Sequence, residues 1–212
     1  MKKNLSLIIA ILIMSSVFSS CTKIKEDNTS SKVTDSDIDK TEIVESAVEE
    51  EQNILFTWKI NLDGVDYILP FDFSELKANG FRLDKTDDWP LNGRSYSVDA
   101  VSPMIRGKFL RSLYWNPTDT PMKYSNCKIG QIEIDVKSRY KLILPGGLKF
   151  DINTTPQDVI DMYGDPYRLS EQDTYTEITY MQGEFSRVDF YFYTQDEKMK
   201  ENNYVILQNF AG

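Results

Sequence analysis

Most of the chain after residue 53 alternates between apolar and polar positions with a period of two, which predicts β-strands. In segment 185–194, Val188, Phe190 and Phe192 share one face, and segments 128–137 and 173–181 show the same alternation. Further strands are expected at 56–62, 65–69, 95–101, 108–115, 140–144 and 203–210. Alternation with one polar face is typical of an antiparallel sheet that is covered on one side.

Two short helices interrupt the predicted strands. The clearer one begins after Thr155, a good N-cap, with Pro156 in its first turn, and it ends at Gly164. The second is expected over Ser74–Asn79, with Gly80 as its stop. The sequence therefore predicts an α+β fold.

The same order of signals occurs twice. Leu69-Pro70 and Leu144-Pro145 each precede a short helix, a glycine and an aromatic-Arg-Leu step, about 85 residues apart. This spacing predicts a tandem repeat, 54–139 and 140–212, although chance recurrence of common turn residues would give the same pattern.

A family resemblance lies in the stretch Leu144–Leu169, LPGGLKFDINTTPQDVIDMYGDPYRL. It resembles the repeat of small envelope lipoproteins of the SmpA/OmlA type and the tandem-repeat architecture of β-lactamase-inhibitor proteins. Residues 54–212 as a whole resemble uncharacterised surface lipoproteins of Firmicutes. The resemblance implies helices on one face of the sheet and an open opposite face; it predicts fold rather than activity.

The first 21 residues read as a targeting segment. Lys2 and Lys3 precede the apolar run Leu5–Phe18, which is shorter than the roughly 20 residues that a transmembrane helix needs. Ser19-Ser20-Cys21 follows and resembles the lipobox of bacterial lipoproteins. We expect residues 1–20 to be a signal peptide and Cys21 to carry a diacylglyceryl anchor with an added fatty acid such as palmitate, which holds a membrane firmly. The alternative is an ordinary secretory signal with a coincidental cysteine.

Residues 21–53 are expected to form a disordered acidic tether. From Thr22 to Asn53 there are ten acidic and four basic residues, and no aromatic residue, glycine or proline. Such a segment buries too little apolar surface to offset its ordering entropy. All three tryptophans and all twelve tyrosines lie after it, so 54–212 is the predicted folded domain.

Composition excludes several classes of site. The chain has no histidine, which rules out Ser-His-Asp and Cys-His catalysis and histidine metal ligands. Its two cysteines cannot supply a four-cysteine zinc site or a disulfide framework, and Cys127 is expected to be buried. The net charge of −9 disfavours nucleic acid and anionic lipid as main partners. No cofactor or metal is expected.

Carboxylates are the remaining catalytic option. Glu133 and Asp135 share a predicted strand face at a separation that suits glycosidase-like chemistry, and Asp84, Asp87 and Asp88 cluster beside Trp89. Acids two residues apart on a solvated strand are common, and an acidic turn is ordinarily a solvated turn. These residues are therefore weak candidates for catalysis or for a hard cation.

A polar strand face is the stronger candidate site. It comprises Tyr175, Arg187, Asp189, Tyr191 and Tyr193, with Glu177 beside them. Tyrosine and arginine are enriched at protein interfaces because they combine contact area with hydrogen bonding. Alternatively, the tyrosines pair across strands and shield the sheet.

These patterns predict a non-enzymatic envelope lipoprotein, anchored outside the cytoplasm through Cys21, that binds another envelope protein or a cell-wall glycan. Two alternatives remain at this point: a carboxylate-dependent enzyme acting on wall glycan, and an inhibitor of an extracellular hydrolase. No Asp follows Cys21, so in a Gram-negative host the lipoprotein sorting rule would favour the outer membrane.

Overall fold

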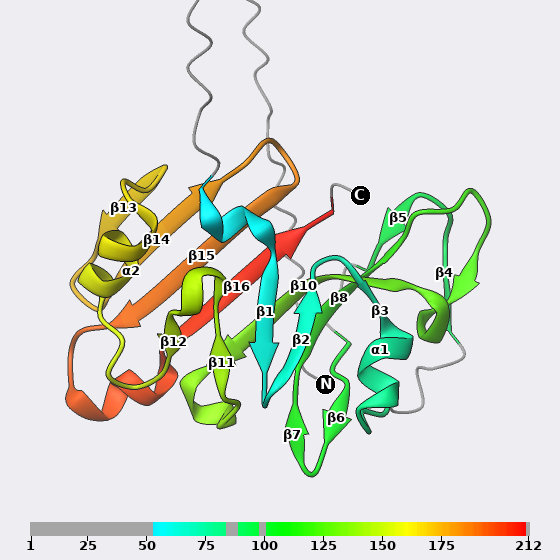
Figure 1. Cartoon of the computed structure of the whole chain (residues 1–212), viewed down its shortest axis with the longest axis horizontal. Helices are drawn as coiled ribbons and strands as arrows, with labels where there is room; N and C mark the ends of the chain where they lie inside the picture. Colours follow the sequence, from blue (N-terminus) through cyan, green and yellow to red (C-terminus); the bar gives the residue numbers. More distant parts are fainter. Residues whose placement is uncertain (1–52, 84–88, 98–100, 211–212) are drawn as a thin grey trace, which may run out of the picture. The chain divides into compact units, whose positions relative to one another are not determined.

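The computed structural model describes residues 53–83, 89–97 and 101–210, in which antiparallel strands and short helices form an α+β fold (Figure 1). The predicted leader 1–20, Cys21 and the tether up to residue 52 lie outside these residues. So do Asp84, Asp87 and Asp88.

A large, wholly antiparallel sheet is built mainly from the second half of the chain. Its strand order is β13-β14-β15-β16-β10-β8-β5, and β3 also pairs with β10. The strands are β3 (Phe71–Asp72), β5 (Ser95–Tyr96), β8 (Arg111–Asn116), β10 (Lys128–Asp135), β13 (Arg168–Glu171), β14 (Tyr175–Met181), β15 (Ser186–Tyr193) and β16 (Tyr204–Asn209).

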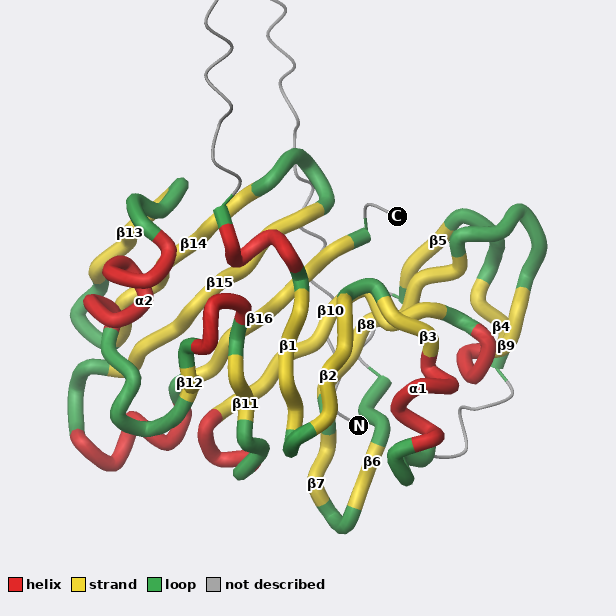
Figure 2. The backbone as a smooth tube through the Cα atoms, in the orientation of Figure 1, coloured by secondary structure: helices red, strands yellow, loops and turns green. Residues whose placement is uncertain are grey.

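A second, four-stranded sheet, in the order β12-β11-β1-β2, lies in front of the large one (Figure 2). It contains β1 (Lys59–Leu62), β2 (Val65–Ile68), β11 (Leu142–Ile143) and β12 (Lys149–Phe150). Two separate hairpins complete the strands: β4 (Pro90–Leu91) with β9 (Met122–Lys123), and β6 (Met104–Ile105) with β7 (Lys108–Phe109).

The core fills the space between the two sheets. The alternating apolar residues of β14, β15 and β16 face it, and Ile178, Val188, Phe190 and Leu207 are fully buried. Phe150 on the small sheet contacts Phe190 with ring centroids 6.1 Å apart. The sequence predicted the covered face of the large sheet correctly, but it did not predict that a second sheet covers it.

Both helices pack on the same face of the large sheet. α2 (Pro156–Tyr163) begins at the predicted N-cap, Thr155, which forms a capping box: the Thr155 hydroxyl accepts from the Asp158 amide, and the Asp158 carboxylate accepts from the Thr155 amide. α1 (Phe73–Ala78) begins one residue earlier than predicted, after Asp72. No helix in the described part of the chain is long and apolar enough to cross a membrane.

Several strand predictions were too long. Residues 54–57 form a 3₁₀ helix, η1 (Ile54–Thr57), because the Asn53 side chain accepts from the Leu55 amide and caps it. Residues 136–138 likewise leave the strand pattern as η4 (Val136–Ser138), capped by Asp135. The remaining 3₁₀ helices are η3 (Tyr124–Asn126), η5 (Pro145–Gly147) and η6 (Glu197–Asn202).

Candidate functional site

The face of the large sheet that points away from the core carries the predicted tyrosines. The strand register places Tyr175 opposite Tyr193, and Tyr191 opposite both Glu177 and Tyr204. Directly opposed residues on neighbouring strands lie close enough for their side chains to touch. We call this group, Tyr175, Glu177, Tyr191, Tyr193 and Tyr204, the tyrosine patch.

The rings of the patch pack against one another. Tyr191 and Tyr204 are stacked nearly parallel, with centroids 4.4 Å apart and an interplanar angle of 13°. Tyr175 contacts Tyr191 and Tyr193 at 6.1 and 6.3 Å with tilted rings. All four tyrosines are half-buried, so each is held by its neighbours and still reaches the surface.

Glu177 is the polar centre of the patch. Its carboxylate accepts a hydrogen bond of 2.9 Å from the Tyr191 hydroxyl and forms an ion pair with Arg168 of β13. Burial, and then the hydrogen bond to Glu177, raise the pKa of Tyr191 above its ordinary value, and burial raises the pKa of Tyr204 to about 12. Both hydroxyls therefore keep their protons at neutral pH. Tyr191 already donates its proton to Glu177, so towards a ligand its oxygen can only accept a hydrogen bond.

Asp189 was predicted to lie on an exposed face, and this was wrong. Its side chain is buried, with one oxygen accepting from the Thr179 hydroxyl at 2.9 Å and the other from Arg187 Nε at 2.6 Å. Glu177 is buried as well. Both lie on strands that are paired on each side: Asp189 lies between Thr179 and Ile206, and Glu177 lies between Ser170 and Tyr191. Asp189 therefore positions Arg187 and does not offer a free charge.

Asp189 should make stability depend on pH. Burial raises its pKa above the ordinary value of 3.8, against the lowering effects of Thr179 and Arg187. The folded state therefore takes up this proton before the unfolded state does, so the carboxyl adds stability as the pH falls from its folded pKa to its unfolded pKa. Asp189→Asn should abolish this gain, which urea unfolding between neutral pH and about pH 4 would measure. The exposed Asp173→Asn should keep it; an unchanged profile in Asp189→Asn would contradict the assignment.

The structure brings together Tyr175, Tyr191 and Tyr193, and places Arg187 and Asp189 beside them on β15. Sequence analysis missed two members of the site. Tyr204 belongs to a predicted strand, but its place beside Tyr191 depends on β16 pairing with β15. Arg168 was read only as part of a repeated motif, and its ion pair with Glu177 depends on the β13–β14 pairing.

The catalytic carboxylates proposed from the sequence are engaged in structural contacts. Glu133 forms an ion pair with Arg111 of the neighbouring β8, and Asp135 accepts from the Ser138 amide at the start of η4. Within the described residues, no group of three or more Cys, Asp or Glu side chains could hold a metal ion.

Cys127 is fully buried, and its thiol lies 3.3 Å from the Lys123 carbonyl oxygen. Burial raises its pKa to about 11, so it remains a thiol at neutral pH.

Gly146 and Gly147 belong to the η5 turn, where both adopt positive φ angles. Trp89 is largely exposed, whereas Trp115 on β8 is half-buried.

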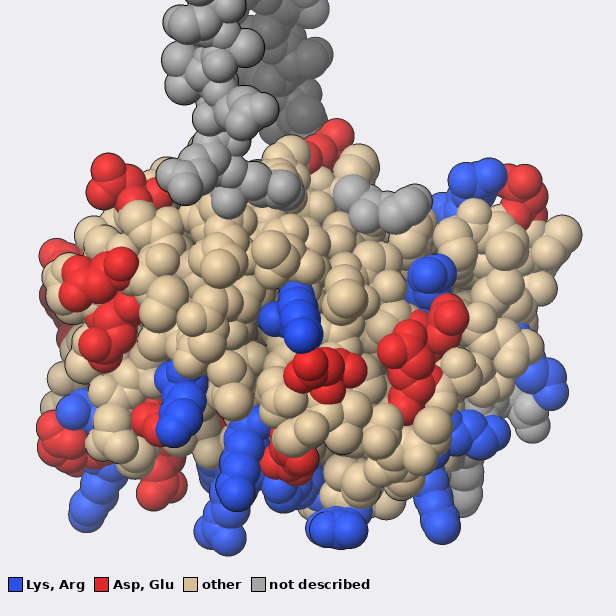
Figure 3. Space-filling view, viewed as in Figure 1, with Lys and Arg blue, Asp and Glu red and all other residues tan. Residues whose placement is uncertain are grey.

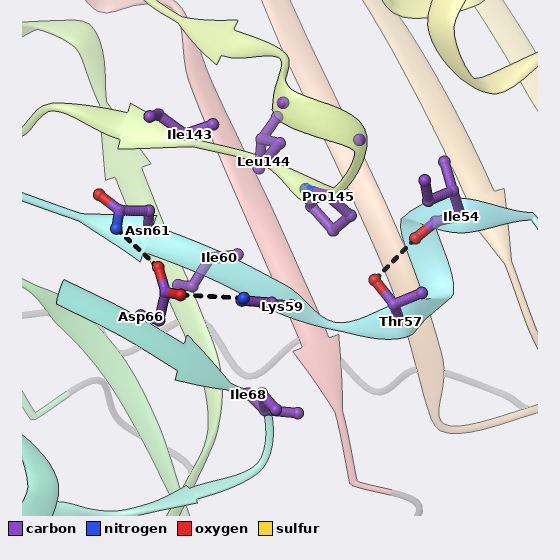
Figure 4. A pocket seen from close by; sticks show the side chains of 12 residues that line it. Ile54, Thr57, Lys59, Ile60, Asn61, Asp66, Ile68, Ile143, Leu144 and Pro145 are labelled. Atoms are coloured by element: carbon purple, nitrogen blue, oxygen red, sulfur yellow. Dashed lines mark hydrogen bonds and ion pairs between the residues drawn. The ribbon is translucent and has the colours of Figure 1, made fainter. Parts of the chain in front are cut away.

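A groove of about 670 Å³, which was not predicted from the sequence, lies on the outer face of the small sheet (Figure 4). Ile54, Ile68 and Ile143 line its sides, with the two exposed isoleucines Ile54 and Ile68 facing solvent. Asp66 is satisfied by Asn61 and Lys59, at 2.7 and 2.9 Å. The groove is therefore mainly apolar, and the charges of Lys59 and Asp66 in its lining are paired with each other.

Comparison with known proteins gives no family for this chain: no family model, no curated protein and no solved structure matches it. A function for it therefore has to rest on the residues described above.

Proposed function

We propose that this chain is an envelope lipoprotein, anchored at the outer side of a membrane through Cys21, whose domain binds a partner protein through the tyrosine patch and catalyses no reaction. The lipobox-like segment before Cys21 and the acidic composition of residues 22–53 support the anchor and the tether. The patch itself is the observation that supports binding.

The tyrosine patch has the properties of a protein-binding surface. Its rings are fixed by stacking, so little side-chain entropy remains to be lost on binding. Its hydroxyls stay protonated, and Arg168 and Arg187 lie exposed at its border. Surfaces that combine tyrosine and arginine in this way are enriched at protein interfaces.

A protein fits this surface better than a glycan. A sugar ring packs flat on the exposed face of an aromatic ring, and such a face must be free of other contacts. In the patch, Tyr191 and Tyr204 cover each other's faces at 4.4 Å. They therefore present ring edges and hydroxyls, which suit hydrogen bonding and side-chain packing by a protein.

Replacing Tyr175 and Tyr193 together with alanine should weaken partner binding at least about tenfold, because aromatic anchors commonly contribute about 2 kcal/mol or more. Capture from an envelope extract, followed by mass spectrometry, would identify the partner, and titration with that purified protein would measure the affinity. The matched control is Tyr167→Ala, since Tyr167 is 74% exposed and belongs to no described ring contact. Equal affinities for the double variant and the control would disprove the proposal.

The anchor has its own test. Cys21→Ala should abolish incorporation of radiolabelled palmitate and release the protein from the membrane fraction, because two acyl chains are needed for firm anchoring. Cys127→Ala is the control and should still be labelled. Labelling that persists in Cys21→Ala would exclude the proposed anchor.

We also infer that the domain arose by duplication, as its sequence predicts and as the likeness to SmpA/OmlA-type and β-lactamase-inhibitor-type repeats implies. In support, α1 and α2 each have a capping box and each place an aromatic ring on the same sheet face, Phe73 on Tyr114 and Tyr163 on Phe190.

A further inference from the structure

One edge of the domain carries several cations that form no ion pair with a described acid. Residues 54–212 contain 18 basic and 23 acidic residues, yet basic side chains gather along the lower edge in Figure 3. Five cations on the β6–β7 turn, on η4 and its exit, and on β12 form no ion pair with any described residue. These five, which we call the basic rim, are Arg106, Lys137, Arg139, Lys141 and Lys149.

Lys108 and Asp63 hold the segments of the basic rim together. Lys108 Nζ of β7 donates to Asp63 at 3.0 Å and to the Arg139 carbonyl oxygen at 2.9 Å. The other oxygen of Asp63 accepts from the Lys141 amide at 2.9 Å. The β6–β7 hairpin, which turns at Arg106, is thereby fixed beside the segment that joins η4 to β11.

The remaining cations follow from the small sheet and from η4. β12 pairs with β11 so that Lys149 lies opposite Ile143, two residues after Lys141. Lys137 and Arg139 border a hollow of about 420 Å³, which Asp151 and Glu201 also line. Those two acids and Asp63 reduce the positive charge of the rim, but its five cations and Lys108 outnumber the three acids.

The distribution of charge indicates the kind of ligand. The cations lie on the β6–β7 turn, on η4 and its exit, and on β12, and do not converge on one point. A small anion would contact few of them, whereas a polymer with repeated negative charges could contact all. Lysine and arginine both bind phosphate oxygens, and arginine can do so with two parallel hydrogen bonds.

Part of the rim lies at the end of β1. The chain enters the described domain at Asn53, beside η1, and β1 then runs from there towards Asp63 (Figure 1). Asp63 follows the last residue of β1, so the part of the rim beside it, Arg139 and Lys141, lies at the opposite end of β1 from Asn53. Lys149 pairs with Ile143, which lies opposite Asn61 within β1.

We propose that the basic rim binds a linear, phosphate-bearing polymer outside the membrane. The choice of a polymer rests on the spread of the cations over three segments, and its place outside the membrane rests on the proposed function; the cationic site itself does not. The rim shares no residue with the tyrosine patch, so an experiment can disprove binding at one of these surfaces without disproving binding at the other.

Long-chain inorganic polyphosphate is the probe, and its binding to the purified full chain would be followed by fluorescence anisotropy. Five phosphate contacts predict a salt slope of about −3.5, so tripling the salt concentration should weaken binding about 50-fold. Lys137→Glu/Lys149→Glu should weaken it at least about tenfold, because both side chains are exposed and their reversal turns attraction into repulsion.

The matched control is Lys77→Glu/Arg94→Glu, which changes the net charge equally at exposed cations elsewhere. Retained binding in this control would support the rim, and equal loss in both pairs would overturn it. Absence of polyphosphate binding by the wild type would also overturn it. A third outcome would also overturn it: the wild type binds phosphatidylglycerol vesicles better than phosphatidylcholine vesicles, this preference depends on Lys137 and Lys149, and polyphosphate does not bind. The site would then be a membrane contact. Tyr175→Ala/Tyr193→Ala should leave polyphosphate binding unchanged.

Discussion

Replacing Phe190 with alanine is expected to lower the free energy of unfolding by about 4 kcal/mol, within the range for large aromatic truncations in a core. Phe190 is fully buried and contacts rings from both layers: Phe150 on the small sheet, Tyr163 on α2, and Tyr180 and Phe192 on the large sheet. Few of these neighbours could move into the space without breaking contacts elsewhere. Urea unfolding followed by near-ultraviolet circular dichroism would measure the loss.

Phe185→Ala is the control for this prediction, because Phe185 lies just before β15 and is 50% exposed. It should cost less than about 1 kcal/mol. If Phe190→Ala were as mild as Phe185→Ala, the two layers would not be joined through this residue.

Replacing Asn116 with alanine should cost about 3 kcal/mol, because several backbone groups would lose a buried hydrogen-bond partner at once. Asn116 is fully buried, and its amide nitrogen lies 3.0, 3.0 and 2.8 Å from the carbonyl oxygens of Leu91, Asn92 and Thr120. Its carbonyl oxygen accepts from the Thr118 amide and hydroxyl. One side chain therefore holds the loops around β4 and β8 in place.

Asn116→Asp separates the donor role from the acceptor role. The carboxylate could still accept from Thr118, but its charge would face three carbonyl oxygens, so the loss at neutral pH should equal or exceed that of Asn116→Ala. Partial recovery on acidification, measured by thermal unfolding, would confirm the cause. The exposed Asn92→Ala should be nearly neutral, and an Asn116→Asp variant as stable as the wild type would refute the donor role.

The strands and the clearer helix could be predicted from local pattern alone. The alternation in 185–194 identified β15 and its buried face, and Thr155, Pro156 and Gly164 fixed the limits of α2, since capping and turn residues act over a few positions. The small sheet could not be found in this way. Its strands β1 and β11 are about 80 residues apart in the chain, and their pairing of Asn61 with Ile143 depends on tertiary packing.

The candidate site shows the same limit. Tyr175, Tyr191 and Tyr193 could be grouped because β14 and β15 form a hairpin, whose register is set locally. Tyr204 and Arg168 depend on further pairings, and the burial of Asp189 depends on side chains from several strands. Alternation indicates which face a side chain occupies, but it does not show how well that face is solvated.

Net charge does not describe how charge is distributed over the domain. The value of −9 disfavours polyanions as main partners, yet much of that charge comes from residues 22–53, and within the basic rim the cations outnumber the acids beside them. Binding depends on the field within roughly 10 Å of the surface at moderate salt, so segregation of charge matters more than the total.

The position of β16 in the large sheet bears on the timing of folding during synthesis. β16 comes last among the strands in the described sequence, yet it lies between β15 and β10 and pairs with both. A nascent chain that ends before Tyr204 would leave two hydrophobic half-sheets with bare edges. Completion of the sheet must therefore wait until residues 204–209 have left the ribosome.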